Sequence, residues 1–168
     1  FIVHHCYPLG SLDEINVEWV KRVLTKDGVI EGELELAAVL HMMDISRHVP
    51  PSLRLLMLDQ LRIALSQERG AYAASRTGRT AIGADDIAYV QRILRDGLAS
   101  GAEPFSPATI EIIESIDRET SAQGSHPDWQ ALLETVLPFR SQAPARVEAP
   151  RRWLHVPDSF FLEGEMVA

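Results

Sequence analysis

Residues 19–28 read WVKRVLTKDG, and residues 89–97 read YVQRILRDG. The match extends upstream, where Val17 corresponds to Ile87. Both stretches space their apolar residues three and four apart, as an amphipathic helix does, and both end on an Asp-Gly pair that is typical of a turn. The repetition predicts that one helix-and-turn unit occurs twice in the chain.

The correspondence continues downstream of the two Asp-Gly pairs. LHMMD, which ends at Asp44, matches IESID, which ends at Asp117. PSLRLL, which begins at Pro51, matches PDWQAL, which begins at Pro127. No window shows the sustained alternation of a half-buried strand. The sequence therefore predicts three helices in each copy.

The predicted fold class is all-α. The two repeat units cover about residues 11–69 and 81–138, and each alone is too small to bury its apolar faces. We therefore expect two pseudo-symmetric three-helix units packed into one globular domain over residues 1–139. Residues 140–168 are expected to form a linker and an extended C-terminal arm.

Local signals predict the boundaries of the first three helices. The first begins at Ser11, with Glu14 at the capping-box spacing, and ends at the first Asp-Gly pair. The second covers residues 33–47, with Leu36, Val39, Leu40 and Met43 on its inner face. The third begins at the proline pair, ends at Gly70 and is apolar around much of its girth, so we expect it to be the most buried helix.

The second half begins with small and polar residues at 71–83, which predict a flexible connection. Ser106 before Pro107 predicts the start of the fifth helix. Ser125 with Asp128 predicts the start of the sixth.

Composition narrows the class of protein. The net charge of the 168 residues is −8, and all of that excess lies on residues 1–137, which argues against a nucleic-acid-binding surface. Cys6 is the only cysteine, as expected of a reducing compartment, so we expect a cytoplasmic protein. The absence of a long apolar run predicts no transmembrane segment, and the start of the chain does not resemble a signal peptide.

The C-terminal arm is predicted to be a docking element. The linker SQAPARVEAPRR precedes WLHVPDSFFLEGEM, whose large aromatic side chains are expected to be buried against protein. The predicted partner-binding residues are Arg151, Arg152, Trp153, Phe160 and Phe161. Their expected partner is a groove on the same domain, another protein, or a second copy in a homodimer.

The stretch TKDGVIEGELE at residues 25–35 allows two interpretations. It is not a calcium-binding EF-hand, because aligning Gly28 with the invariant glycine places Leu34 where the bidentate glutamate belongs. In the first interpretation Gly28 ends a helix in the left-handed conformation and Ile30 enters the core. In the second, the carboxylates of three residues hold a divalent cation: Asp27, Glu31 and Glu33.

No catalytic motif stands out in the sequence. A glycine-rich phosphate loop, a GxSxG elbow and an HExxH helix are all absent. We therefore expect a non-enzymatic protein-interaction module without a cofactor. A divalent-metal sensor that uses the acidic corner is the alternative, and an enzyme without a recognisable motif is a further one.

The Asp27-Gly28 corner resembles that of the TerB-like helical domains associated with bacterial tellurite resistance and stress responses. Asp27, Gly28 and Ile30 match the family pattern, whereas Leu34 stands where the family has a glutamate. The resemblance covers chiefly residues 17–44. It implies a small all-helical domain, a capacity for divalent cations, and work as an adaptor in multiprotein complexes or near membranes.

Overall fold

The computed structural model describes residues 10–76, 81–100, 105–120 and 124–138, and these are helical apart from turns and two isolated backbone bridges. This confirms the all-α fold class. The helices, in chain order, are α2 (Glu14–Leu24), α3 (Glu33–Ile45), α4 (Pro51–Gln67), α5 (Gly70–Ser75), α6 (Ala84–Ser100), α7 (Pro107–Thr120) and α8 (Pro127–Val136). The predicted C-terminal arm lies outside the described residues.

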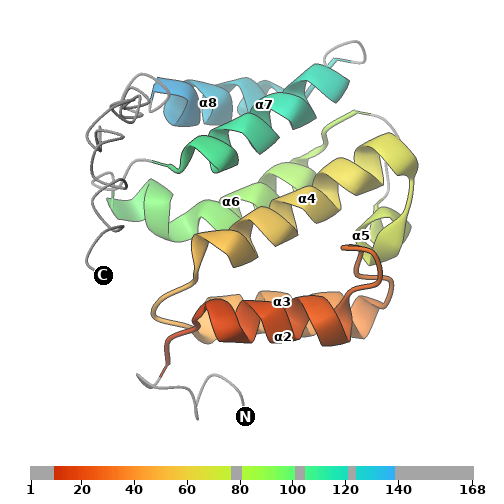
Figure 1. Ribbon diagram of the computed structural model, residues 1–168. Helices are drawn as coiled ribbons and strands as arrows, with labels where there is room; N and C mark the ends of the chain where they lie inside the picture. Colours follow the sequence, from red (N-terminus) through yellow and green to blue (C-terminus); the bar gives the residue numbers. More distant parts are fainter. Residues whose placement is uncertain (1–9, 77–80, 101–104, 121–123, 139–168) are drawn as a thin grey trace, which may run out of the picture.

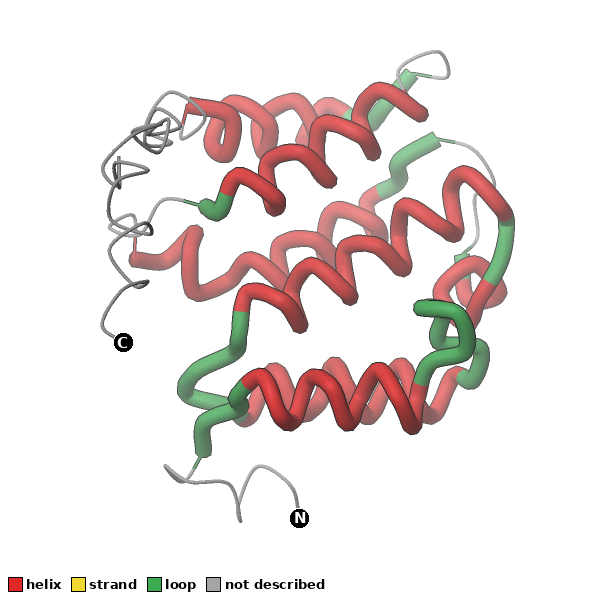
Figure 2. The backbone as a smooth tube through the Cα atoms, viewed as in Figure 1, coloured by secondary structure: helices red, strands yellow, loops and turns green. Residues whose placement is uncertain are grey.

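The longer helices form three layers (Figure 1). Helices α2 and α3 form one outer layer, α4 and α6 the middle layer, and α7 and α8 the other outer layer. Helix α4 contacts α2 on one side and α7 on the other, and it also packs on α5 and α6. Short α5 lies at one end of the molecule, against α3 and α4 (Figure 2).

Helix α4 supplies the centre of the core, as predicted. Leu53, Met57, Leu58 and Leu61 are each at most 1% exposed. Full burial of a side chain of this size stabilises the fold by about 1.5–3 kcal/mol. Trp129 of α8 is also fully buried. The core therefore runs through all three layers.

The start of α2 differs from the prediction. Asp13, not Ser11, is the N-cap: its carboxylate accepts the backbone N–H of Asn16 at 2.9 Å, and the Asn16 side chain accepts the N–H of Asp13 at 3.0 Å. Ser11 instead forms a parallel backbone bridge with His48. An aspartate and an asparagine therefore make the reciprocal cap that the sequence suggested for a serine and a glutamate.

The predicted N-cap of α7 is confirmed, and that of α8 is wrong. Ser106 caps α7, because its hydroxyl accepts the N–H of Thr109 at 3.2 Å. At α8 the prediction of Ser125 is wrong: His126 is the N-cap, and its Nδ1 accepts the N–H of Asp128 at 3.2 Å. An imidazole nitrogen serves here because a cap needs only an acceptor within reach of the first free N–H groups.

The predicted flexible connection after α4 is also partly wrong. Residues 70–75 form α5, in which Ala71 and Tyr72 are buried. The small residues that suggested a loop allow this short helix to pack closely on α3 and α4. Residues 77–80 lie outside the described part of the chain.

The second Asp-Gly pair lies in different local structure from the first. Helix α6 continues through Gly97 to Ser100, whereas α2 ends at Leu24. A Cβ atom on Gly97 would lie 2.5 Å from the ring of Phe105, so this glycine allows a close approach. Superposition of the two predicted three-helix units stays a prediction.

Candidate functional site

The corner between α2 and α3 is a two-residue hairpin turn. Asp27 and Gly28 both have positive φ, 53° and 79°. Lys26 and Val29 exchange two backbone hydrogen bonds around them, at 2.8 and 3.0 Å. Positive φ at both central positions defines the type I′ turn, for which Asp-Gly is a favoured pair. The prediction that α2 ends at Gly28 is therefore wrong, although Gly28 is left-handed as expected.

Gln60 of α4 fastens this corner to the core. Its side-chain oxygen accepts the backbone N–H of Ile30 at 2.9 Å, and its side-chain nitrogen donates to the carbonyl of Gly28 at 2.9 Å. The same nitrogen donates to the carbonyl of Leu56 at 3.1 Å. Ile30 is 1% exposed, which confirms the prediction that it enters the core.

The start of α5 closes the corner from the other side. The N–H of Ala71 donates to the carbonyl of Ile30 at 2.8 Å. Gly70 has φ +89°, and a Cβ there would lie 2.8 Å from the Val29 side chain. Arg69 forms an ion pair with Glu31 at 3.0 Å. The corner is thus held by α4 and α5 together.

The three predicted metal ligands are all exposed at this corner. Asp27 lies in the turn, Glu33 begins α3, and Glu31 between them is paired with Arg69. Within the described ranges, no three or more His, Cys, Asp or Glu side chains are grouped so that they could hold an ion. The structure does not bring the three carboxylates together, and metal binding stays a prediction.

Exposed large apolar side chains lie on one layer of the molecule. Among the described residues they are Ile15 and Val23 of α2, and Leu34 and Ile45 of α3, with exposures of 77%, 53%, 82% and 42%. The layers formed by α4, α6, α7 and α8 have none in their described parts. These four side chains make the layer of α2 and α3 the candidate interaction surface among the described residues.

Helix α3 is apolar on both of its faces. Its predicted inner face, Leu36, Val39, Leu40 and Met43, is buried, as expected. Its outer face consists of Leu34, Ala38, His41 and Ile45, all of them exposed. Between Glu35 and Asp44, His41 is the only polar residue. Apart from His41 the outer face of α3 is apolar, which is unusual for a helix face that is open to solvent.

Helix α7, in the opposite outer layer, can be compared with α3. If Asp44 is aligned with Asp117, as the sequence correspondence suggests, three positions of the outer face of α3 have counterparts on α7. The counterparts of Ala38, His41 and Ile45 are Glu111, Glu114 and Arg118. The residues at these aligned positions are charged on α7 and, apart from His41, apolar on α3.

The sequence interpretation missed the outer face of α3 because it followed the inner face alone. The signal was present in Leu34 and Ile45, which fall on the side of the helix opposite the buried positions.

Ion pairs fix α3 against the middle layer. The guanidinium of Arg92, on α6, shares its Nε–H between the two carboxylate oxygens of Asp44, each at 3.1 Å, and donates a further hydrogen bond from Nη2. These hydrogen bonds hold the pKa of Asp44 below its usual value. Arg95 lies 3.8 Å from the same carboxylate. These contacts with Arg92 and Arg95 of α6 help to orient α3 on the middle layer.

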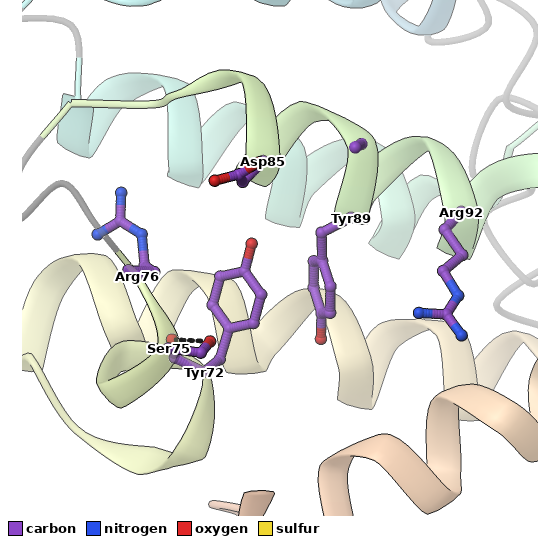
Figure 3. A pocket seen from close by; sticks show the side chains of 7 residues that line it. Tyr72, Ser75, Arg76, Asp85, Tyr89 and Arg92 are labelled. Atoms are coloured by element: carbon purple, nitrogen blue, oxygen red, sulfur yellow. Dashed lines mark hydrogen bonds between the residues drawn. The ribbon is translucent and has the colours of Figure 1, made fainter.

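A cavity of about 330 Å³ opens between α5 and α6. Figure 3 shows the rings of Tyr72 and Tyr89 between Arg76 and Arg92. The ring centroids are 4.2 Å apart. Burial raises the pKa of both phenols, and for Tyr72 the nearby Asp86 carboxylate adds to that effect.

Tyr72, Arg76 and Tyr89, which line this cavity, form hydrogen bonds within the fold. Arg76 and Asp86 form a buried ion pair with hydrogen bonds of 2.9 and 2.8 Å, and Asp86 also accepts the Tyr72 hydroxyl at 3.0 Å. The Tyr89 hydroxyl donates to the backbone carbonyl of Met57 at 2.8 Å. The hydrogen bonds of Asp86 with Tyr72 and Arg76 therefore tie α5 to the start of α6.

Comparison of the chain with protein-family models, curated proteins and solved structures gives no match. In the part of the chain that the structure describes, none of the helices has the length and apolar content to cross a bilayer. The five predicted partner-binding residues, Arg151, Arg152, Trp153, Phe160 and Phe161, lie outside the described residues. The exposed apolar residues of α2 and α3 thus remain as the candidate site within the described residues.

Proposed function

We propose that this protein is a non-enzymatic interaction module that binds protein through the outer layer of α2 and α3. The observation that carries the proposal is Leu34, which is 82% exposed on a helix that is apolar on both faces. Transfer of apolar surface out of water is the main favourable term in protein association. A contact that buries these exposed apolar side chains would stabilise the complex: Leu34, Ile45, Ile15 and Val23.

The surface is suited to a helical partner. Leu34, Ala38, His41 and Ile45 follow one another along a single ridge, and an amphipathic helix can lay its own apolar ridge beside it. The small Ala38 permits close approach of a second backbone. Exposed Glu33 and Glu35 lie at one end of the ridge, so a partner with a basic residue at that end is favoured.

A cytoplasmic adaptor of the TerB-like kind fits this proposal. The lone cysteine and the acidic balance of the chain support that setting. In this account the acidic corner positions α3, since Gln60 and Ala71 anchor its backbone to α4 and α5. The C-terminal arm, with Trp153, Phe160 and Phe161, is proposed as a second docking element that binds protein independently.

The proposal is tested by comparing three forms of the full chain as baits in the lysate of the source cells. The baits are the unaltered protein, Leu34→Asp, and the control Ala131→Asp, which alters an exposed alanine of α8. A true partner is retained by the unaltered protein and by the control and is lost with Leu34→Asp. Each such partner is then purified and titrated calorimetrically against the three forms.

The expected result is binding that weakens at least tenfold with Leu34→Asp and is unchanged in the control, since an unpaired charge buried in an apolar contact costs more than about 1.4 kcal/mol. Equal binding by all three forms would contradict the proposal. In the same titrations, alanine at Trp153, Phe160 and Phe161 measures the contribution of the arm.

A further inference from the structure

A groove of about 320 Å³ lies between α4 of the middle layer and α7 of the outer layer. Leu55 of α4 and Ile112 of α7 give it an apolar lining, and both are half-buried. Arg62 of α4 and Arg118 of α7 line it as well. This α4–α7 groove therefore combines apolar side chains with two guanidinium groups.

The charge of the groove is opposite to that of the whole chain. Of the described residues that line it, two are arginines and one, Glu111, is an acid, which gives the lining a net charge of +1. The chain as a whole has a net charge of −8. Arg62 donates from Nε to Asp59 at 2.7 Å, and its Nη groups form no hydrogen bond with the described residues. The groove thus has donors for a further carboxylate.

We propose that the C-terminal arm docks in the α4–α7 groove of its own chain. Phe160 and Phe161 pack on the apolar lining. Glu163 and Glu165 pair with the two arginines. Residues 153–168 contain three acidic residues and no Lys or Arg, so their charge complements that of the groove. This inference rests on the proposed role of the arm as a docking element and names its binding site.

The order of residues along the groove agrees with their order along the arm. Leu55 lies near the start of α4, and Arg62 lies farther along the helix. Ile112 likewise precedes Arg118 on α7. The starts of α4 and α7 lie at the same end of the molecule as the end of α8 (Figure 1). An arm that follows α8 therefore meets the apolar lining first and the arginines second, as its own aromatic and acidic residues follow one another.

The lengths agree as well. Ile112 and Arg118 are six residues apart, about 9 Å along the axis of α7. In an extended segment, Phe161 lies about 7 Å from Glu163 and about 13 Å from Glu165, so the two carboxylates bracket this distance. The 21 residues at 139–159 can span about 70 Å, far more than the length of α7. The linker therefore does not restrict docking.

Two other cavities suit the arm less well. A cavity of about 410 Å³ at the starts of α2 and α4 is lined by Asp13 and Glu14, whose carboxylates repel an acidic segment. The arginines of the cavity between α5 and α6 are hydrogen-bonded to carboxylates of the fold. Charge thus favours the α4–α7 groove over both.

Paramagnetic relaxation in the full chain tests the docking. Cys6→Ser removes the only native thiol, and Ser159→Cys then carries a nitroxide label in the arm. We expect the label to remove most of the methyl signal of Ile112. The methyl signal of Ile45 on α3, in the opposite outer layer, is the matched control and should persist. An Ile112 signal that the label leaves intact would overturn the inference.

A charge reversal tests the pairing with the arginines. Glu163→Arg combined with Glu165→Arg should restore the Ile112 signal in the labelled protein, because the arm then has the same charge as the groove. The control Glu148→Arg alters a linker acid and should leave the signal suppressed. The inference fails if the reversed arm still suppresses the Ile112 signal.

The remaining outcomes name other binding sites for the arm. If nitroxide-labelled chains suppress the Ile112 signal of unlabelled chains in a mixture, the arm docks on a second copy, and docking within one chain is overturned. Loss of the Ile45 signal would place the arm on the layer of α2 and α3 and would also overturn the inference. These measurements use no partner, so the proposed function still stands or falls on the capture experiment with Leu34→Asp.

Discussion

The side-chain oxygen of Gln60 accepts the backbone N–H of Ile30, 30 residues earlier in the chain, at 2.9 Å. Gln60 is 3% exposed, and its nitrogen holds the carbonyl of Gly28 at the same time. One buried side chain thus satisfies both a donor and an acceptor of the corner that leads into α3. The position of the outer face of α3 depends on this contact.

Replacement of Gln60 by leucine should lower the free energy of unfolding by about 2 kcal/mol or more, because it leaves the buried N–H of Ile30 and a carbonyl without partners. Urea denaturation measures the change. The control is Gln91→Leu on the exposed side of α6, which should alter stability by less than about 0.5 kcal/mol. Equal stability of the two variants would show that the contact does not hold the corner.

Substitutions at the two central residues of the hairpin turn should affect the stability of the protein differently. Gly28→Ala should destabilise the protein by about 1 kcal/mol, since alanine resists positive φ, although no atom lies within 4 Å of the new Cβ. Asp27→Asn should change little, because asparagine tolerates that conformation.

Thermal melts of both turn variants, with and without calcium, magnesium or zinc, also address the metal alternative. A cation-dependent stabilisation that is abolished by Asp27→Asn would support metal binding at Asp27, Glu31 and Glu33. Its appearance would contradict a purely structural corner.

The buried carboxylate of Asp86 holds α5 to α6. Asp86→Ala removes the carboxylate that balances the buried Arg76 guanidinium and accepts the Tyr72 hydroxyl, and such a loss costs about 3–5 kcal/mol. Its neighbour Asp85 is exposed, so Asp85→Ala is a matched control with little expected effect. Chemical denaturation of the two variants should give clearly separated midpoints, and coincident midpoints would contradict the role of Asp86.

Asp44 makes part of the stability depend on pH. Hydrogen bonds from Arg92 lower its pKa in the folded state, so the ion pair contributes above the unfolded-state pKa of about 4 and is lost as pH falls through the lower folded-state value. For a partly exposed pair the contribution is at most about 1 kcal/mol. The stability difference between the unaltered protein and Asp44→Asn should be constant from neutral pH to about pH 5 and should shrink below pH 4. A difference that grows on acidification would contradict this assignment.

Helical spacing was enough to predict the all-α fold and the central place of α4. Leu53, Met57, Leu58 and Leu61 were identifiable because a helix that is apolar around most of its girth must be surrounded by others. The ends of the helices were harder to predict from the sequence. The caps at Asp13 and His126 depend on which acceptor reaches a free N–H, and several nearby residues can provide one.

The corner and the candidate site needed tertiary information. Asp-Gly favours a turn with positive φ, yet Asp96-Gly97 lies within α6, so the pair alone does not decide the local structure. At Asp27-Gly28 the contacts from Gln60 and Ala71 hold the hairpin on α4 and α5. The outer face of α3 is recognisable once Leu36 and Val39 are known to point inward, because Leu34 and Ile45 must then point outward.

The burial of Leu34 in solution tests the central claim most directly. Methyl NMR of the full chain with a soluble paramagnetic probe reports how far each methyl group is open to solvent, and it can be recorded with and without a captured partner. We expect the Leu34 and Ile45 methyl groups, open in the free protein, to become protected in the complex, while the exposed Ala131 methyl group stays open. Leu34 and Ile45 methyl groups that remain fully open in the presence of every captured partner would contradict the proposed interaction surface.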